Sequence, residues 1–152
     1  MICPCEKKGD TSVVDSRPTE DGTAIRRRRL CICGERFTTF ERIQIRELMV
    51  VKKNGRKSVF DRDKLSKSIY IALKKRPIDT ETIEKFISHV SRSLEELGQG
   101  EVSTNTIGTM VMDGLKDLDP VGYVRFASVY RNFREEKDFV QFVDKLNVYK
   151  KT

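Results

Sequence analysis

The sequence predicts an α+β protein, in which a small β-rich N-terminal domain precedes a β-hairpin on a mainly helical bundle. Two observations support this fold class. All cysteines lie within the first 33 residues, in a segment with few large apolar side chains. Beyond residue 47, apolar residues recur at helical spacing between capping residues and prolines. We therefore expect domains at residues 1–47 and 48–139, and a helical extension with a polar tail at 140–152.

The composition sets limits on compartment and partners. Charged residues make up 35% of the chain, apolar residues 38%, and the formal net charge is +7. The positive charge is compatible with an acidic partner such as nucleic acid or nucleotide. No apolar stretch is long enough to cross a bilayer, and the N-terminus lacks the apolar core of a signal peptide. We expect a cytoplasmic protein without a membrane partner, whose thiols stay reduced.

The first domain contains two close cysteine pairs, Cys3 with Cys5 and Cys31 with Cys33. In a reducing compartment such pairs indicate a Zn²⁺ site rather than disulfides. Zinc binding would stabilise a segment that has no sizeable core of its own. One residue separates the members of each pair, and alternate residues of an extended chain share a face, so both sulfurs can face one ion. The alternative is a set of ordinary reduced cysteines; the clustering favours a zinc ribbon.

Two segments, Thr11–Asp15 and Arg36–Phe40, have the composition of ribbon strands. Between them, a run of arginines precedes the second cysteine pair. Such a run repels itself unless an anion binds it, whereas on a rigid ribbon it presents donors to phosphates and guanine edges. If the run is extended, alternate arginines point to opposite sides. The alternative to DNA binding is that the arginines form a solvated charged face. The candidate DNA contacts are Arg17, Arg26, Arg27, Arg28, Arg29, Arg36, Thr38 and Thr39.

The second domain is expected to begin with a hairpin. Asn54-Gly55 lies between two β-leaning runs and predicts a two-residue turn, because both residues tolerate a positive φ. Lys52, Lys53 and Arg56 surround this turn, and cations on a rigid turn can hold a triphosphate. The alternative to triphosphate binding is that these cations lie on a solvated hairpin tip.

Helices follow the hairpin. Asp61 is expected to cap a first helix that stops before Pro77, and a second helix is expected over Thr80–Leu97. Ser103 caps a third, and Asp119 followed by proline begins a fourth.

The aromatic residues of the fourth helix are expected in the core or at a subunit interface. Apolar residues between Phe139 and Leu146 predict that this helix continues or is followed by a short amphipathic one.

Motifs typical of enzymes are absent from the sequence. It contains no Gly-x-x-x-x-Gly-Lys phosphate loop, no zinc-protease histidine pair and no nucleophile elbow. We therefore expect a binding protein rather than an enzyme.

Several segments resemble the NrdR family of bacterial ribonucleotide-reductase repressors. In the first domain these are Asp10–Arg17, Ile25–Arg29 and Glu35–Glu41. The rest of the chain resembles that family's ATP cone at Val51-Lys52, Asn54-Gly55, Phe60, Lys64-Leu65, Lys75–Pro77 and Tyr123–Arg131. The likeness covers about residues 1–139. One departure is that the family has two residues between the cysteines of each pair, where this chain has one.

The resemblance implies a repressor that binds double-stranded operator DNA upstream of ribonucleotide-reductase genes. It also implies an ATP cone that binds ATP or dATP and resets the oligomeric state of a homo-oligomer. By analogy with the cone motif, the nucleotide-site candidates are Val51, Lys52, Lys53, Arg56, Asp61 and Lys64. Two alternatives stay open: a cone-based sensor that acts through protein partners, and a fragment or relative of ribonucleotide reductase itself. The chain is too short for the reductase's catalytic barrel, which needs roughly 200 or more residues.

Overall fold

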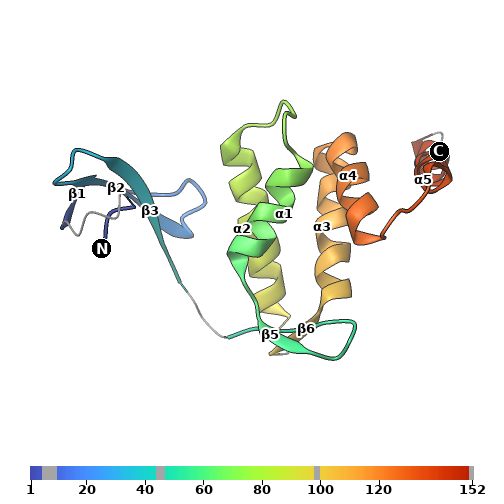
Figure 1. Ribbon diagram of the computed structural model, residues 1–152, viewed down its shortest axis with the longest axis horizontal. Coiled ribbons are helices and arrows are strands. Elements are labelled where there is room, and N and C mark those ends of the chain that lie inside the picture. Colours follow the sequence, from blue (N-terminus) through green and yellow to red (C-terminus); the bar gives the residue numbers. More distant parts are fainter. Residues whose placement is uncertain (5–9, 44–46, 98–99, 151–152) are drawn as a thin grey trace. The chain divides into compact units, whose positions relative to one another are not determined.

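The computed structural model describes residues 1–4, 10–43, 47–97 and 100–150, with side chains described as far as residue 147. The chain splits into two compact units, Met1–Ile45 and Arg46–Thr152. Figure 1 shows strands in the first unit and mostly helices in the second, which agrees with the predicted α+β class.

The first unit is built on an antiparallel sheet in the order β1-β2-β3. Its strands are β1 (Thr11–Pro18), β2 (Ala24–Cys31) and β3 (Arg36–Arg42). The arginine run is therefore extended, and it forms the central strand. Among the described residues of this unit, only Cys3, Ala24 and Cys31 are buried. A sheet with so few buried side chains needs another source of stability.

A second, smaller sheet opens the helical unit. Its strands are β4 (Met49–Val51), β5 (Lys57–Val59) and β6 (Glu101–Ser103), in the order β5-β4-β6. β4 pairs antiparallel with β5 and parallel with β6, so that Val50 lies opposite Val102. The sequence pattern does not predict β6, because its three residues carry no readable alternation and take their strand form from β4.

The turn between β4 and β5 differs from the predicted two-residue turn. The amide of Gly55 donates to the carbonyl of Lys52 at 2.9 Å, and the amide of Lys52 donates to the carbonyl of Arg56 at 2.8 Å. Gly55 has φ +82°, whereas Asn54 does not adopt a positive φ. The loop therefore has three residues, Lys53 to Gly55, with glycine alone in the left-handed region.

The helices of this unit are α1 (Arg62–Ala72), α2 (Thr80–Glu96), α3 (Thr104–Leu118), α4 (Pro120–Tyr130) and α5 (Glu136–Lys150). Asp61, Ser103 and Asp119 act as N-caps, as predicted. α1 packs against α2 and α4, and α3 packs against α2 and α4. The most deeply buried side chains of the core are Ile69, Ile87, Leu94, Val111 and Leu115.

α5 is a separate helix, not a continuation of α4. Asn132 has φ +53°, which interrupts the helical backbone directly after α4. α5 returns to the core through Phe142, which is buried and whose ring lies at 36° to that of Tyr123, with a centroid separation of 5.3 Å. The domain border expected between residues 139 and 140 falls inside α5.

Candidate functional site

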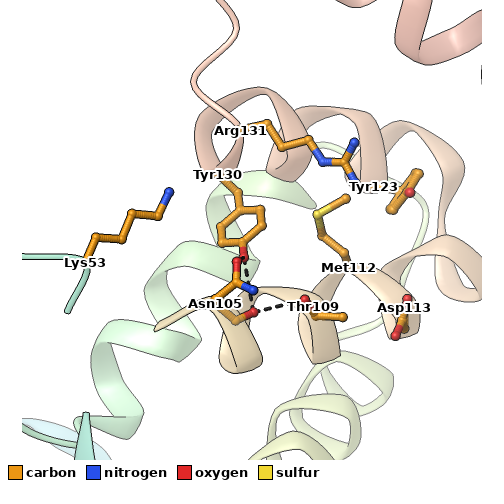
Figure 2. Close-up of a pocket in the computed structure, with 8 residues that line it drawn as sticks. All are labelled: Lys53, Asn105, Thr109, Met112, Asp113, Tyr123, Tyr130 and Arg131. Atoms are coloured by element: carbon orange, nitrogen blue, oxygen red, sulfur yellow. Dashed lines mark hydrogen bonds between the residues drawn. The ribbon is translucent and has the colours of Figure 1, made fainter. Parts of the chain in front are cut away.

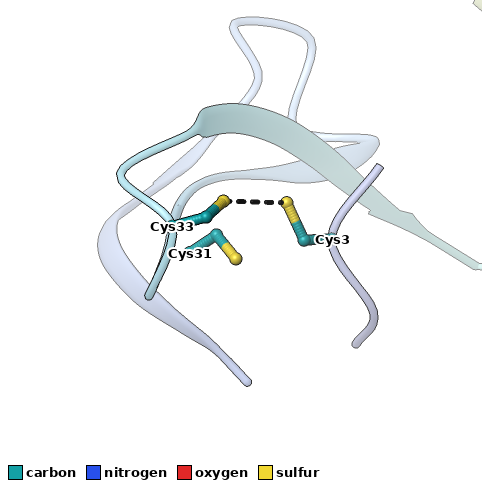
Figure 3. Close-up of side chains that lie close together, drawn as sticks. All are labelled: Cys3, Cys31 and Cys33. Atoms are coloured by element: carbon teal, nitrogen blue, oxygen red, sulfur yellow. Dashed lines mark hydrogen bonds between the residues drawn. The ribbon is translucent and has the colours of Figure 1, made fainter. Parts of the chain in front are cut away.

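The described cysteines converge on one point in the first unit (Figure 3). The Sγ atoms of Cys3, Cys31 and Cys33 all lie within 4.8 Å of one another, and those of Cys3 and Cys33 are 3.7 Å apart. Thiolates about 2.3 Å from a tetrahedral zinc ion lie about 3.8 Å from one another. The thiols of Cys3 and Cys31 are also buried. The chemistry and spacing of this donor set therefore fit zinc. Cys5, the fourth predicted ligand, lies outside the described residues.

The second cysteine pair sits on a tight turn rather than on an extended chain. Cys31 ends β2, and its carbonyl accepts a hydrogen bond from the amide of Gly34 at 2.9 Å. Its amide donates to the carbonyl of Glu35, also at 2.9 Å, and Gly34 has φ +87°. This is the same kind of three-residue turn that joins β4 to β5. A single residue between the cysteines therefore suffices to bring both sulfurs to one side.

The arginines of β2 divide into two pairs with different surroundings. Arg26 and Arg28 are exposed, and neither side chain forms a hydrogen bond or ion pair with another residue of the described ranges. Arg27, by contrast, forms an ion pair with Glu41 at 2.8 Å. Arg29 donates to the Oγ1 of Thr39 at 3.1 Å. One face of the strand therefore offers free guanidinium groups, while the charges on the other face are engaged within the sheet.

The register extends this exposed face across the sheet. Arg17 lies opposite Arg26 in β1, Thr38 lies opposite Arg28 in β3, and Arg36 lies opposite Leu30. Directly paired residues share a face of an antiparallel sheet. The resulting basic face comprises Arg17, Arg26, Arg28, Arg36 and Thr38. It also carries Asp15, which lies opposite Arg28 and forms an ion pair with Arg17 at 3.2 Å.

Two predicted DNA contacts, Arg27 and Thr39, oppose each other on the other face, and Arg29 lies there too. The structure thus groups five of the candidates on the basic face and separates the remaining three from them.

The second unit contains a cavity of about 500 Å³ between the β4–β5 turn and helices α3 and α4 (Figure 2). This volume is in the range of small-molecule sites. The residues that line it are Lys53, Asn105, Thr109, Met112, Asp113, Tyr123, Tyr130 and Arg131.

Tyr130 forms one wall of the cavity and is held on several sides. Its hydroxyl hydrogen-bonds with the side-chain oxygen of Asn105 at 2.6 Å and lies 3.1 Å from the carbonyl of the same residue. Its ring packs against Gly108, where any Cβ would clash with it. Phe126 stacks on it with a centroid separation of 6.1 Å. The aromatic wall is therefore rigid.

Cations approach this wall from two elements. The Nζ of Lys53 lies 5.9 Å from the centroid of the Tyr130 ring, and Arg131 follows Tyr130 directly at the end of α4. Figure 2 shows Lys53 reaching toward the ring from the hairpin, with Arg131 beyond it. Asp113 contributes a carboxylate to the lining. A planar aromatic wall between cations suits a ligand that combines a flat ring with an anionic group.

The predicted nucleotide residues lie along the hairpin and the start of α1. Of these candidates, the cavity lining includes Lys53. Asp61 is engaged as the N-cap of α1, and Lys64, with a side chain 82% exposed, lies 4.0 Å from its carboxylate. Val51 ends β4, while Lys52 and Arg56 are joined through their backbones across the turn.

Sequence reasoning missed most of the cavity lining. The segment Tyr123–Arg131 carries part of the family resemblance, yet its aromatic residues are predicted to lie in the core or at an interface. That prediction is confirmed for Phe126, which packs against the core cluster. Tyr123 and Tyr130 pack there only in part and also face the cavity. A tyrosine beside an arginine was the sequence feature that could have indicated the cavity, because a buried tyrosine hydroxyl usually needs a hydrogen-bond partner.

No helix in the described ranges is long and apolar enough to span a membrane.

Comparison with known proteins bears on both units. Residues 1–41 match the family described as "Transcriptional repressor NrdR-like, N-terminal domain", and residues 48–136 match the ATP cone domain. The chain is 87% identical to a transcriptional repressor NrdR of Pelagibacter ubique, over 99% of each chain.

Two further relatives carry the same name. The protein from Azorhizobium caulinodans is 61% identical over 97% of this chain and 86% of its own length. The protein from Rhodospirillum rubrum is 58% identical over 96% of this chain and 97% of its own length. These relatives are regulators by name, not enzymes. With its zinc-ribbon and ATP-cone domains, the chain belongs to the NrdR family of transcriptional repressors.

Proposed function

We propose that this protein is a cytoplasmic, nucleotide-responsive repressor of ribonucleotide reductase genes. Residues 1–47 bind double-stranded operator DNA, residues 48–139 bind ATP or dATP, and residues 140–152 are a C-terminal extension. The nucleotide resets the oligomeric state of a homo-oligomer and thereby controls DNA binding. The observation that carries the proposal is the guanidinium pair of Arg26 and Arg28, which is exposed in the same unit as the thiol cluster.

Zinc would be held by Cys3, Cys31 and Cys33, with Cys5 as the fourth ligand. Its role is structural, because four thiolates leave no open coordination position for a substrate. The bound ion would fix the turn at Cys31–Gly34 and so hold β2 and β3 in register. The arginines of β2 then meet DNA as a rigid row, and little conformational entropy is lost on binding.

We propose that all the predicted residues contribute to DNA binding, some by direct contact and others by supporting the sheet. The basic face, Arg17, Arg26, Arg28, Arg36 and Thr38, provides the direct contacts to phosphates and base edges. Arg27, Arg29 and Thr39 support that face, because the Arg29–Thr39 hydrogen bond and the Arg27–Glu41 ion pair brace the strands behind it. The guanidinium groups of Arg26 and Arg28 can bind anions without first breaking an ion pair, whereas that of Arg17 is paired with Asp15 at 3.2 Å.

Nucleotide binding is proposed for the cavity beside Tyr130. The aromatic wall stacks on the base, and Lys53 and Arg131 bind the phosphates. Lys52, Arg56 and Lys64 lie near the hairpin and would add positive potential to the phosphate side. Val51 acts as the end of β4, and Asp61 acts as the N-cap of α1, where its carboxylate accepts hydrogen bonds from the amides of Asp63 and Lys64.

An electrophoretic mobility-shift titration tests the proposal. The zinc-loaded protein is titrated onto a duplex from a ribonucleotide-reductase promoter and onto a scrambled duplex, each without nucleotide, with ATP and with dATP. We expect a preference for the promoter duplex that differs between ATP and dATP. Equal binding to both duplexes in every nucleotide state would overturn the operator proposal. It would point to a sensor that acts on protein partners instead.

A further inference from the structure

Helix α5 contacts residues that line the cavity. The ring of Phe142 lies 5.3 Å from that of Tyr123, centroid to centroid. The guanidinium carbon of Arg131 lies 5.2 Å from the centroid of the same Phe142 ring. Tyr123 and Arg131 both line the cavity, whereas Phe142 is 7% exposed and lies outside the lining. A single buried side chain of α5 therefore contacts two cavity residues from behind.

The stacking of Arg131 leaves its donors available. A guanidinium that lies over a ring uses its face, while its N–H groups point outward in its own plane. Arg131 forms no ion pair with a carboxylate of the described ranges. Arg131 can therefore rest on Phe142 and donate to an anionic ligand at the same time.

Without Phe142, the position of Arg131 would be less defined. Arg131 also lines a second cavity of about 300 Å³, which Phe142 lines as well, together with Arg134, Asp138 and Lys145. An arginine at the rim of two cavities can turn its side chain into either one, and the contact with the Phe142 ring restricts this movement. Fixing a side chain before binding removes about 0.5–1.5 kcal/mol of ordering cost, or roughly two- to tenfold in affinity.

We infer that Phe142 is a positioning residue that holds Arg131 at the cavity for the phosphates of the ligand, so that nucleotide binding and docking of α5 stabilise each other. The inference rests on the proposed nucleotide site. Since coupling between two equilibria is reciprocal, a ligand that engages Arg131 must strengthen the contact of α5 with the core. The presence of a ligand in the cavity thereby strengthens the contact between the C-terminal helix α5 and the core.

Isothermal titration calorimetry with ATP on the full-length, zinc-loaded protein tests the positioning role. The variants are Arg131→Ala, Phe142→Leu, and the two combined. Leucine keeps the apolar volume that docks α5 but removes the ring face. We expect about a ten- to hundredfold loss of affinity for Arg131→Ala and roughly a two- to tenfold loss for Phe142→Leu. The double variant should match Arg131→Ala alone, because Phe142 acts through Arg131.

A matched control lies on the same helix. Val140 is 57% exposed, so Val140→Ala should bind ATP like the wild type. If Phe142 served only the packing of α5, Phe142→Leu would lower the melting temperature without changing ATP affinity. That result, or full additivity of the two substitutions, would overturn the inference.

Amide hydrogen exchange of residues 136–147 gives an independent measurement. In the wild type, ATP should slow exchange in this segment, whereas in Arg131→Ala even saturating ATP should not. Unchanged exchange in the wild type with ATP bound would overturn the coupling and leave the nucleotide site intact. A wild-type protein that binds no ATP in calorimetry would overturn the proposed function as well.

Discussion

Arg76 donates two hydrogen bonds to the carboxylate of Asp119, from Nε at 2.9 Å and from Nη2 at 3.0 Å. Asp119 is 6% exposed, and it also accepts a hydrogen bond from the amide of Gly122 at 2.7 Å as the N-cap of α4. One carboxylate thus joins the loop after α1 to the first turn of α4. Because α4 carries Tyr123 and Tyr130, this ion pair also positions the aromatic side of the cavity.

The Arg76–Asp119 pair predicts a specific pH dependence of stability. Its hydrogen bonds hold the pKa of Asp119 below the ordinary value, which is about 3.9 in an unfolded chain. A carboxylate with a lowered pKa stabilises the fold above that value, and the contribution is lost as pH falls through the folded pKa. Asp119→Asn keeps an oxygen to cap α4 but has no charge. We expect it to be less stable than the wild type at pH 7.

Urea unfolding at pH 7, 5, 4 and 3, followed by helical circular dichroism, measures this difference. The gap between wild type and Asp119→Asn should be constant at pH 7 and 5 and should shrink below about pH 4. Asp79 and Asp138 also have lowered pKa values, but they titrate in both proteins and cancel in the comparison. A gap that persists unchanged at pH 3 would show that the charge of Asp119 contributes nothing.

Gly108 predicts a link between helix packing and ligand binding. A Cβ at this position would clash with the ring of Tyr130, and one at Gly114 would clash with the ring of Phe86. Overpacking of this kind costs about 1–3 kcal/mol, so both Gly108→Ala and Gly114→Ala should be destabilised. Only Gly108→Ala displaces a cavity residue. ATP titrations should therefore show weaker binding for Gly108→Ala alone, and equal affinities for the two variants would exclude Tyr130 from the site.

Lys53 and Lys52 are adjacent, but they should contribute differently to nucleotide affinity. Lys53 lines the cavity, whereas Lys52 does not. Removal of a charge-assisted hydrogen bond costs about 1.5–3 kcal/mol, or roughly ten- to a hundredfold in affinity. We expect this effect for Lys53→Ala with ATP and dATP alike, because a phosphate contact does not distinguish the sugars. Lys52→Ala should have a smaller effect. Calorimetry showing the reverse order would place the phosphates on the other side of the turn.

Zinc should stabilise the first unit alone. We expect about one zinc per chain in the wild type, because the thiol cluster offers one tetrahedral site. Cys31→Ser removes a buried ligand, so zinc content should fall to well under half of that amount. The helical unit has its own core and should keep its melting transition.

Ile32→Ala is the control for this zinc prediction. Ile32 is 81% exposed and lies between the two cysteines of the turn, so its substitution should leave the zinc content unchanged. If Cys31→Ser retains full zinc content, the ion is not held by this cluster.

The two arginine pairs of β2 should affect DNA binding differently. Filter-binding titrations over a range of salt concentrations compare Arg26→Ala/Arg28→Ala with Arg27→Ala/Arg29→Ala. The first double variant should lower the log–log salt slope by about 0.9 per subunit for each phosphate that the arginines no longer neutralise. The second removes charges that are already engaged by Glu41 and Thr39, and should change the slope less. Identical slopes would mean that the arginines act as a diffuse electrostatic patch.

The local features of the fold could be predicted from the sequence. The N-caps Asp61, Ser103 and Asp119 were predictable because a cap depends on a side chain and amides within three residues of it. The alternation of the arginine run followed from strand geometry alone. The cysteine cluster was recognisable because the spacing of thiols along the chain reflects the site that they form.

Other features depended on partners that are distant in the chain. β6 forms because it pairs with β4, with Val102 opposite Val50, and no pattern within its three residues predicts that pairing. Alternation divided the arginines into pairs, but only Glu41 and Thr39 on β3 decide which pair is engaged. The cavity residues Asn105 and Asp113 come from α3 and Arg131 from the end of α4, and they carry no shared motif. Short-range hydrogen bonding therefore determined the helix caps, whereas packing between distant segments decided which charges remain free and where the cavity lies.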